Sequence, residues 1–371
     1  MNNKSNRLLE LDILRGFIIV VMALDHANHF IAKGKLSSEL WTGSFPDYQG
    51  QALPFLTRAV THLAAPGFFF LMGVGMFLFA HNRRARGWTK RQTIMHFAVR
   101  GFILVIIQFV LENPAWNIGS DSSSVTYFGV LYALGGCMIL GGFLLILPPK
   151  WLTLLSVVLI VATELLLPQQ VVGFVQYAYP LRLLLLPGFT EGIYVLYPIM
   201  PWLGVTGLGI VYGHWLRQDE AAALKSALWI GLIAILLFVP IRWFDGFGNI
   251  RAQEGGGWIA FFNVVKYPPS ITFLLLTLGI NLTLLGLLSR APEVVLQVLQ
   301  PLAVFGRVPL FFYVLHLYLY GWLGQWLDPQ GIGIVHMFPY WLLGLFVLWP
   351  LCWGYGRFKQ TQSPNSLFRF I

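Results

Sequence analysis

The segment LDILRGFIIVVMALDHANHFI, residues 11–31, decides the fold, because it is long and apolar enough to cross a lipid bilayer as one helix. Ionisable groups inside hydrocarbon cost free energy, so each one in this segment is a candidate for function. Two such groups lie near its start and three near its end. They are Asp12, Arg15, Asp25, His26 and His29.

The three groups near the end of this segment suit acyl transfer. Such a reaction needs a base that removes a proton from an incoming hydroxyl or amine, and histidine serves near neutral pH. His26 and His29 share a helix face, and Asp25 is expected to orient or hold the His26 imidazole. Arg15 lies eleven residues before His26, roughly 16 Å along a helix axis, and is expected near the cytoplasmic surface. The alternative is that the three groups merely cap the end of a span.

Composition indicates an integral membrane protein. Of the 371 residues, 57% are hydrophobic and 11% are charged, whereas soluble domains have roughly 25% charged residues. The mean hydropathy is +0.70. The formal net charge of +9 does not indicate nucleic acid, because the Lys and Arg residues flank apolar runs, as membrane topology requires. Cys137 and Cys352 lie inside apolar segments, so we expect neither a disulfide nor a metal site.

The apolar runs predict an all-α, polytopic membrane protein with about ten transmembrane helices, in which residues 1–371 form a single transmembrane domain. The apolar stretch 181–187 is too short to span and is expected to be re-entrant or interfacial. Pro198, Pro201 and Pro240 are expected to kink or shorten the sixth and seventh spans. The ten expected spans cover residues 11–31, 61–80, 93–112, 126–147, 151–167, 196–216, 226–244, 270–289, 303–325 and 339–356.

Basic residues predict how the chain lies in the membrane. Loops rich in Lys and Arg stay in the cytoplasm, and the connection 81–92, HNRRARGWTKRQ, is the most basic one. Both termini are then expected in the cytoplasm, and the His26 end of the first helix is expected to face outward. The expected location is the plasma (inner) membrane.

Further ionisable residues extend the candidate site on the outward side. Glu112, in the sequence ENPAW, is a candidate second acid or base, with a solvated helix end as the alternative. His316 lies in the middle of the ninth span and is either a site residue or a packing histidine. His62 is a further candidate, or an interfacial histidine. No metal-ligand spacing, nucleophile elbow or P-loop motif is present in the sequence.

Arginines on the cytoplasmic side are candidates for binding a phosphate-rich donor. Arginine matches phosphate with two parallel hydrogen bonds, so the connection 81–92 suits the adenosine diphosphate part of coenzyme A. The alternative is topology and binding of anionic lipid. Arg100 lies inside the third span and should pair with a carboxylate or a substrate phosphate. The residues expected to bind the donor are Arg15, Arg83, Arg84, Arg86 and Arg100.

Several stretches together resemble the bacterial branch of the heparan-alpha-glucosaminide N-acetyltransferase catalytic-domain family. They are RLLELDILRGFIIVVMALDHANHF, then APGFFFLMGVGMFLF followed by the arginine-rich connection, ENPAW, KYPPS and GRVPLFFYVLHL. The resemblance covers most of the chain, and the combination is specific. The first stretch is also similar to that of acyltransferase family 3, membrane proteins that modify bacterial surface polysaccharides. In that family, too, an Arg-Gly pair is followed by a histidine at about the same separation.

The resemblance implies a transmembrane acyltransferase that takes an acyl group, most simply acetyl, from cytoplasmic acyl-CoA and moves it to a sugar or glycan outside. Arg15 matches the family's Arg-Gly position, and His26 matches the family 3 histidine. In eukaryotic members the catalytic histidine lies in the outward loop between the first two spans, and residues 33–61 here contain no histidine. His26, His29 or His62 would then take its place.

The sequence therefore predicts an acyltransferase in which His26 is the base, Asp25 orients it, and Glu112 or His316 assists. The acceptor would attack the donor directly, or the acyl group would pass through an acyl-histidine. The expected partners are acyl-CoA, a glycan acceptor and the lipid bilayer, without metal or nucleic acid; a homodimer is left open. The alternative is a transporter or flippase of a small molecule or lipid-linked sugar. A third reading is an inactive structural membrane partner.

Overall fold

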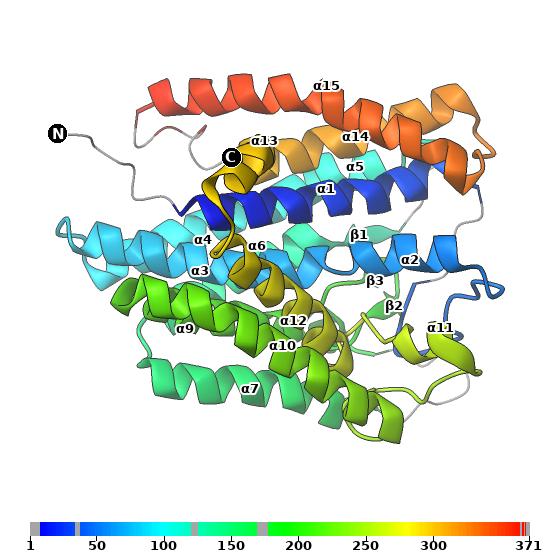
Figure 1. Cartoon of the computed structure of the whole chain (residues 1–371). Coiled ribbons are helices and arrows are strands. Elements are labelled where there is room, and N and C mark those ends of the chain that lie inside the picture. Colours follow the sequence, from blue (N-terminus) through cyan, green and yellow to red (C-terminus); the bar gives the residue numbers. More distant parts are fainter. Residues whose placement is uncertain are drawn as a thin grey trace.

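The structure is a computed structural model that describes residues 8–33, 38–119, 125–168, 177–363, 366 and 368. It is 74% helical, and its long helices lie roughly side by side (Figure 1). The prediction that the fold is built from helices is confirmed.

The helices fall into two groups by length. The long ones are α1 (Leu9–Ile31), α3 (Ala64–Arg84), α4 (Lys90–Ile107), α6 (Val130–Leu144), α7 (Pro149–Leu165), α9 (Ile199–Gln218), α10 (Glu220–Phe244), α12 (Ile271–Leu288), α13 (Glu293–Arg307), α14 (Pro309–Leu327) and α15 (Ile334–Thr361). The short ones are α2 (Ala52–Thr61), the π-helix η1 (Gln108–Glu112), α5 (Asn113–Trp116), α8 (Tyr179–Leu184) and α11 (Gly257–Phe262).

A small sheet lies at the same end of the bundle as α2 and α11 (Figure 1). Its strands are β1 (Thr126–Phe128), β2 (Gly188–Thr190) and β3 (Ile193–Val195), in the order β1-β3-β2. β3 pairs parallel with β1 and antiparallel with β2. The stretch 181–187 runs from α8 into the turn before β2, so it forms part of this end of the molecule.

Five helical segments are long and apolar enough to cross a membrane, in the part of the chain that the structure describes. They are Ala52–Arg84, Lys90–Trp116, Glu220–Phe244, Ile271–Leu288 and Ile334–Thr361. The bent pair α13 and α14 gives a sixth if it counts as one span. The helices α1, α6, α7 and α9 occupy the other predicted ranges. The chain is a multi-pass membrane protein, while the count of ten and the side of the termini stay predictions.

The ninth predicted span, 303–325, is not one straight helix. α13 and α14 meet at an angle of 84°. Pro309 disfavours helical backbone at the residue before it, and Val308 accordingly has φ −133° and ψ 52°. By contrast, α10 runs through Pro240 as a single helix.

The helix α1 lies in the core of the bundle, where it packs against α3, α12, α13, α14 and α15. Glycines allow the closest of these contacts. A Cβ on Gly16 would collide with the carbonyl of Leu302, and one on Gly306 would collide with the carbonyl of Asp12. α1 and α13 therefore cross in near backbone contact, at the end of α1 that carries Arg15.

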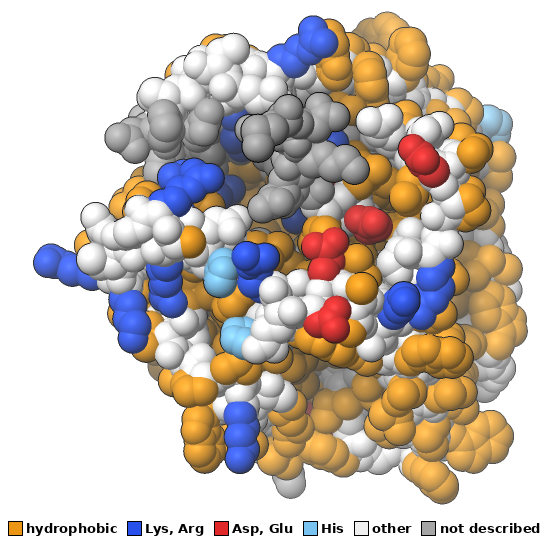
Figure 2. All heavy atoms as spheres, turned by 60° about the vertical axis from the view of Figure 1, so that its left-hand side comes forward, with side chains coloured by type: hydrophobic (Ala, Val, Ile, Leu, Met, Phe, Trp, Pro, Cys, Tyr) orange, Lys and Arg blue, Asp and Glu red, His pale blue; other side chains and the backbone are white. Residues whose placement is uncertain are grey.

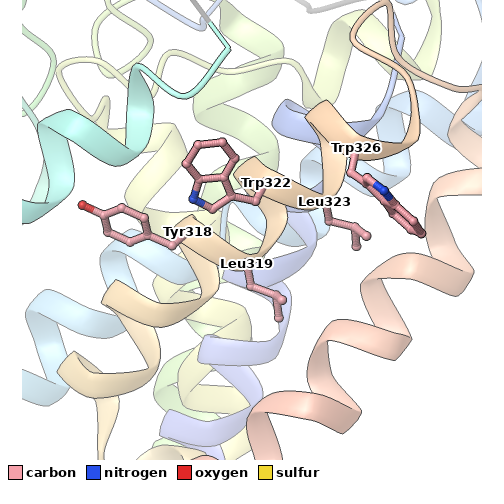
Figure 3. A pocket seen from close by; sticks show the side chains of 5 residues that line it. All are labelled: Tyr318, Leu319, Trp322, Leu323 and Trp326. Carbon is pink, nitrogen blue, oxygen red and sulfur yellow. The ribbon is translucent and has the colours of Figure 1, made fainter.

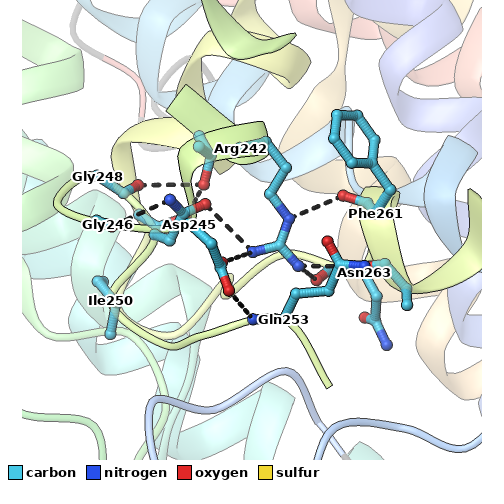
Figure 4. Close-up of polar contacts among 12 residues, drawn as sticks. Arg242, Asp245, Gly246, Gly248, Ile250, Gln253, Phe261 and Asn263 are labelled. Carbon is cyan, nitrogen blue, oxygen red and sulfur yellow. Dashed lines mark hydrogen bonds and ion pairs between the residues drawn. The ribbon is translucent and has the colours of Figure 1, made fainter. Parts of the chain in front are cut away.

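A buried arginine holds the long connection between α10 and α12 (Figure 4). Arg242 is 1% exposed and donates hydrogen bonds to the carbonyls of Ala260 (3.0 Å), Phe261 (2.8 Å) and Asn263 (3.0 Å). Its Nη1 also donates to the carboxylate of Asp245 at 3.3 Å. Because all of these contacts hold the guanidinium, its role is to stabilise the connection between α10 and α12.

Arg242→Lys is expected to lower the free energy of unfolding by about 2–3 kcal/mol, since a point-like ammonium cannot reach all these acceptors and leaves buried carbonyls unpaired. Thermal unfolding of the detergent-solubilised protein measures this loss. The control is Arg357→Lys, because Arg357 is exposed and rests on the Trp353 ring. Equal unfolding temperatures for the two variants would contradict the assigned role.

Candidate functional site

Two histidines from distant parts of the sequence form the centre of the candidate site. Nδ1 of His26, on α1, lies 2.6 Å from Nε2 of His316, on α14. The two rings stack with their centroids 4.8 Å apart. His316 is fully buried and His26 is 8% exposed. The structure thus brings together two of the residues that the sequence offered as candidates.

The hydrogen bonds around this pair have a defined direction. Nδ1 of His316 lies 3.0 Å from the carbonyl oxygen of Phe312, one turn earlier on α14. A carbonyl oxygen only accepts, so this nitrogen carries the proton, and in a neutral imidazole the other nitrogen then accepts. His26 donates to it from Nδ1, which leaves Nε2 of His26 unprotonated. An unprotonated imidazole nitrogen is what a general base requires.

The ENPAW sequence places a carboxyl group and an indole beside these rings. The π-helix η1 lies just before Pro114, which has no N–H to offer the preceding turn. Within this distorted region the indole Nε1 of Trp116 donates to Oε1 of Glu112 at 3.2 Å. The same indole meets the rings of His26 and His29 edge-on, at centroid distances of 5.1 and 4.9 Å. His29 and Glu112 therefore join the site through Trp116.

Glu112 has hydrogen-bonding capacity to spare. Its side chain is 1% exposed, and Oε2 has no hydrogen bond of ordinary geometry among the described residues. The Tyr313 and Gln108 side chains lie against the same carboxyl group. Tyr313 also meets the His26 ring edge-on, with centroids 6.2 Å apart. A buried, unsatisfied carboxyl oxygen beside the histidine pair is a place for a hydroxyl or amine of a ligand.

Nδ1 of the His26 ring, which we expected Asp25 to orient or hold, forms its hydrogen bond with His316. The Asp25 carboxylate accepts from Nη1 of Arg58 at 2.6 Å and from Oγ1 of Thr61 at 3.0 Å. Consecutive residues on a helix point about 100° apart, so Asp25 and His26 are directed to different neighbours of α1. The correction is that Asp25 belongs to an ion-pair cluster next to the histidine pair.

Arg58 links this cluster to the loop between α1 and α2. Its Nε and Nη2 donate to the two carboxylate oxygens of Glu39 at 2.8 and 2.7 Å. Burial raises the pKa of Glu39, but the Arg58 guanidinium outweighs burial and holds that pKa well below its usual range. Nε2 of His62 lies 3.3 Å from Glu39, so this histidine belongs to the cluster of Asp25 and not to the His26 ring. Sequence reasoning missed Arg58 and Glu39; the available signal was an arginine close to an apolar helix.

A second charged group lies at the opposite end of α1. Nη1 of Arg15 donates to Oδ1 of Asp12 and to the carbonyl of Gly306, both at 3.1 Å. Nε of Arg307 donates to the other oxygen of Asp12 at 3.3 Å. α1 is therefore joined to the α13–α14 segment twice, by Asp12 at one end and by His26 at the other.

The other predicted donor arginines lie at this same end, where Figure 2 shows Lys and Arg side chains gathered. Nε and Nη2 of Arg84 are buried and have no hydrogen-bond partner among the described residues. Arg100 is close enough to Arg15 for their like charges to interact. Arg83 lies over two aromatic rings, and Arg86 is exposed. The Arg84 nitrogens without acceptors, with other arginines at the same end of the molecule, fit a ligand that carries phosphate.

Other candidate sites carry less chemistry. A groove of about 350 Å³ on α14 is lined by aromatic and leucine side chains alone (Figure 3): Tyr318, Leu319, Trp322, Leu323 and Trp326. Trp326 is 82% exposed, as expected for a surface that faces lipid. Within the described residues, no group of three or more His, Cys, Asp or Glu side chains is arranged to hold a metal ion.

Comparison with known protein families identifies one family. The sequence model of one family, described as heparan-alpha-glucosaminide N-acetyltransferase, catalytic, matches residues 7–239, which is more than half of the chain. The match contains His26, Glu112 and the predicted donor arginines, whereas His316 lies beyond it. No curated protein matches the chain.

Proposed function

We propose, because the chain belongs to the heparan-alpha-glucosaminide N-acetyltransferase catalytic-domain family, that it carries an acyl group across the plasma membrane to a glycan. Membership makes it an acyltransferase, and its apolar helices make it a multi-pass membrane protein. The donor in this proposal is cytoplasmic acyl-CoA, most simply acetyl-CoA. The acceptor is a hydroxyl or amine of a sugar outside the membrane. The proposed topology has ten spans and places both termini in the cytoplasm.

The hydrogen-bond chain that ends at His26 carries this proposal. Nε2 of His26 takes the proton of the acceptor O–H or N–H while that oxygen or nitrogen bonds to the acyl carbon. The C–S bond of the thioester breaks, and coenzyme A leaves as a thiolate that takes up a proton. His316 keeps the His26 imidazolium in place by accepting from Nδ1. In a two-step route the same Nε2 attacks the thioester carbon first and the C–S bond breaks. The acceptor then attacks the acyl carbon, the bond from that carbon to Nε2 breaks, and the freed Nε2 takes the acceptor's proton.

Glu112 and His29 are assigned to the acceptor side of this reaction. The unsatisfied Oε2 of Glu112 would accept a hydrogen bond from the acceptor and hold it near His26. Trp116 fixes the geometry, because it donates to Glu112 and packs against both histidines. Asp25 is assigned to the neighbouring ion-pair cluster, which stabilises the end of α1.

The arginines at the other end of α1 are assigned to the phosphates of the donor. The nitrogens of Arg84 that have no hydrogen-bond partner among the described residues support this assignment. The neighbouring positive charges of Arg15 and Arg100 support it too. The eleven residues from Arg15 to His26 correspond to roughly 16 Å of helix, which the extended part of the donor would follow.

The test is release of free thiol from acetyl-CoA by the purified protein, with and without sugar acceptors. Thiol release that depends on an acceptor supports the proposal, and the acylated sugar is then identified by mass. A transporter or a structural membrane partner would release no thiol under any of these conditions. Such a result would overturn the assignment as an enzyme.

Arg84→Gln is expected to raise the KM for acetyl-CoA by about 10-fold with little change in kcat, because it removes charge-assisted hydrogen bonds made in the ground state as well as the transition state. Steady-state kinetics at saturating acceptor measure the two constants. Arg91→Gln is the matched control, since Arg91 is an exposed residue of the same connection. If both variants raise KM equally, the effect is general surface charge, and the assignment of Arg84 is wrong.

A further inference from the structure

A buried lysine next to the ion-pair cluster has no role in the reaction described so far. Lys266, in the KYPPS sequence before α12, is 2% exposed. Its backbone N–H and that of Tyr267 both donate to the carbonyl of Glu39 at 3.0 Å. The base of the side chain is therefore fixed against the same loop that carries Glu39.

The ammonium group of Lys266 does not use its hydrogen-bonding capacity. Among the described residues it makes no hydrogen bond or ion pair. Its Nζ lies 5.1 Å from the centroid of the Tyr267 ring. The neighbouring carboxylates of Asp25 and Glu39 both accept from Arg58. An ammonium has three donors, and burying it without acceptors is costly. A ligand oxyanion would satisfy it.

The position of Lys266 suits an acceptor that approaches His26. Its charge acts on Asp25, Glu39 and Arg58, and also on His26 itself. The hydroxyl of Tyr267 lies 3.2 Å from that of Tyr197, so aromatic and hydroxyl groups flank the lysine. Aromatic walls with a few polar groups are typical of sites for small organic ligands.

We propose that Lys266 binds an oxyanion, a carboxylate or a phosphate, of the acceptor, so that the acceptor class is an acidic sugar. This inference rests on the proposed function, because it concerns the acceptor of that same reaction. The competing explanation is purely structural: Lys266 balances Asp25 and Glu39, which share one arginine. That explanation predicts equal losses toward every acceptor when Lys266 is replaced.

The experiment compares three acceptors at fixed acetyl-CoA: methyl glucoside, methyl glucuronide and glucose 6-phosphate. In the wild-type protein kcat/KM is expected to be at least about 10-fold higher for an acidic sugar than for methyl glucoside. Lys266→Gln should lower kcat/KM for the acidic sugar by about 10- to 100-fold and change the neutral one less than about 2-fold. Lys266→Arg should retain most of the preference, and Lys33→Gln, which alters an exposed lysine, should retain all of it.

The protonation state of Lys266 gives a second test of its proposed role. Burial and the Arg58 charge lower the pKa of Lys266 to about 8, against the opposing effect of Asp25 and Glu39. The ammonium is lost as pH rises through that value, so the preference for the acidic sugar should fall above about pH 8 in the wild type and persist in Lys266→Arg. His62 lies on Glu39 and would titrate equally in both proteins.

A binding measurement keeps this inference separate from the proposed function. Methyl glucuronide or inorganic phosphate, without acetyl-CoA, should raise the unfolding temperature of the wild type but not of Lys266→Gln. Equal stabilisation of both proteins, or equal kinetic losses toward all acceptors, would overturn the inference. Absence of thiol release with every acceptor would overturn the proposed function instead, and the binding result would still decide the role of Lys266.

Discussion

His26→Ala is expected to lower acyl transfer by about 10²- to 10⁴-fold, the usual contribution of a positioned general base. The variant removes Nε2 of His26, which the hydrogen-bond chain leaves unprotonated and which accepts no hydrogen bond within the pair. The loss should appear in kcat, because the proton moves only as the acceptor attacks. Thiol release at saturating acetyl-CoA and acceptor measures it, with the amount of folded, inserted protein determined alongside.

The control for this prediction is His214→Ala. His214 lies near the end of α9 and packs against Phe77, away from the candidate site. It should keep wild-type activity. Wild-type turnover in His26→Ala would end the assignment of His26 as base and would direct attention to His29, which contacts the same indole.

The positions of the apolar helices could largely be predicted because the length and apolarity of a run are local properties, while the number of spans stays a prediction. The bend at Val308 is also local, since Pro309 restricts the residue before it, but a continuous apolar run concealed it. The hydrogen bonds that Arg242 makes to the connection between α10 and α12 could not be predicted. Its acceptors are backbone carbonyls on a loop, and carbonyls have no sequence signature.

The candidate site was predictable as a set of residues but not as a set of contacts. His26, His29 and Glu112 lie toward the ends of apolar helical segments, which charge and hydropathy indicate. The partner of His26 is 290 residues away, and periodicity does not tell which helices are neighbours in a bundle. That Asp25 and His26 bond to different neighbours was predictable, because adjacent residues of a helix do not face the same neighbour.

In the proposed mechanism His316 selects the reactive tautomer of His26, and this role has its own test. His316→Phe keeps a ring against His26 but removes the acceptor for the Nδ1 proton. The proton is then free to move to Nε2, and a general base in the wrong tautomer does not work. We expect kcat to fall by about 10²- to 10⁴-fold, with a much smaller change in the KM for acetyl-CoA.

A merely structural role of His316 would give a different pattern. His316→Gln restores a side-chain carbonyl oxygen that can accept from Nδ1 of His26, so it should recover part of kcat, whereas a loss caused by packing alone would favour the apolar Phe. The pH–rate profile adds a readout that packing does not move: its acidic limb, which reports protonation of the base, should shift when the partner of His26 is removed. Wild-type kcat in His316→Phe would show that the 2.6 Å contact between His26 Nδ1 and His316 Nε2 does not set the tautomer of His26. The assignment of Nε2 of His26 as the base would then be wrong.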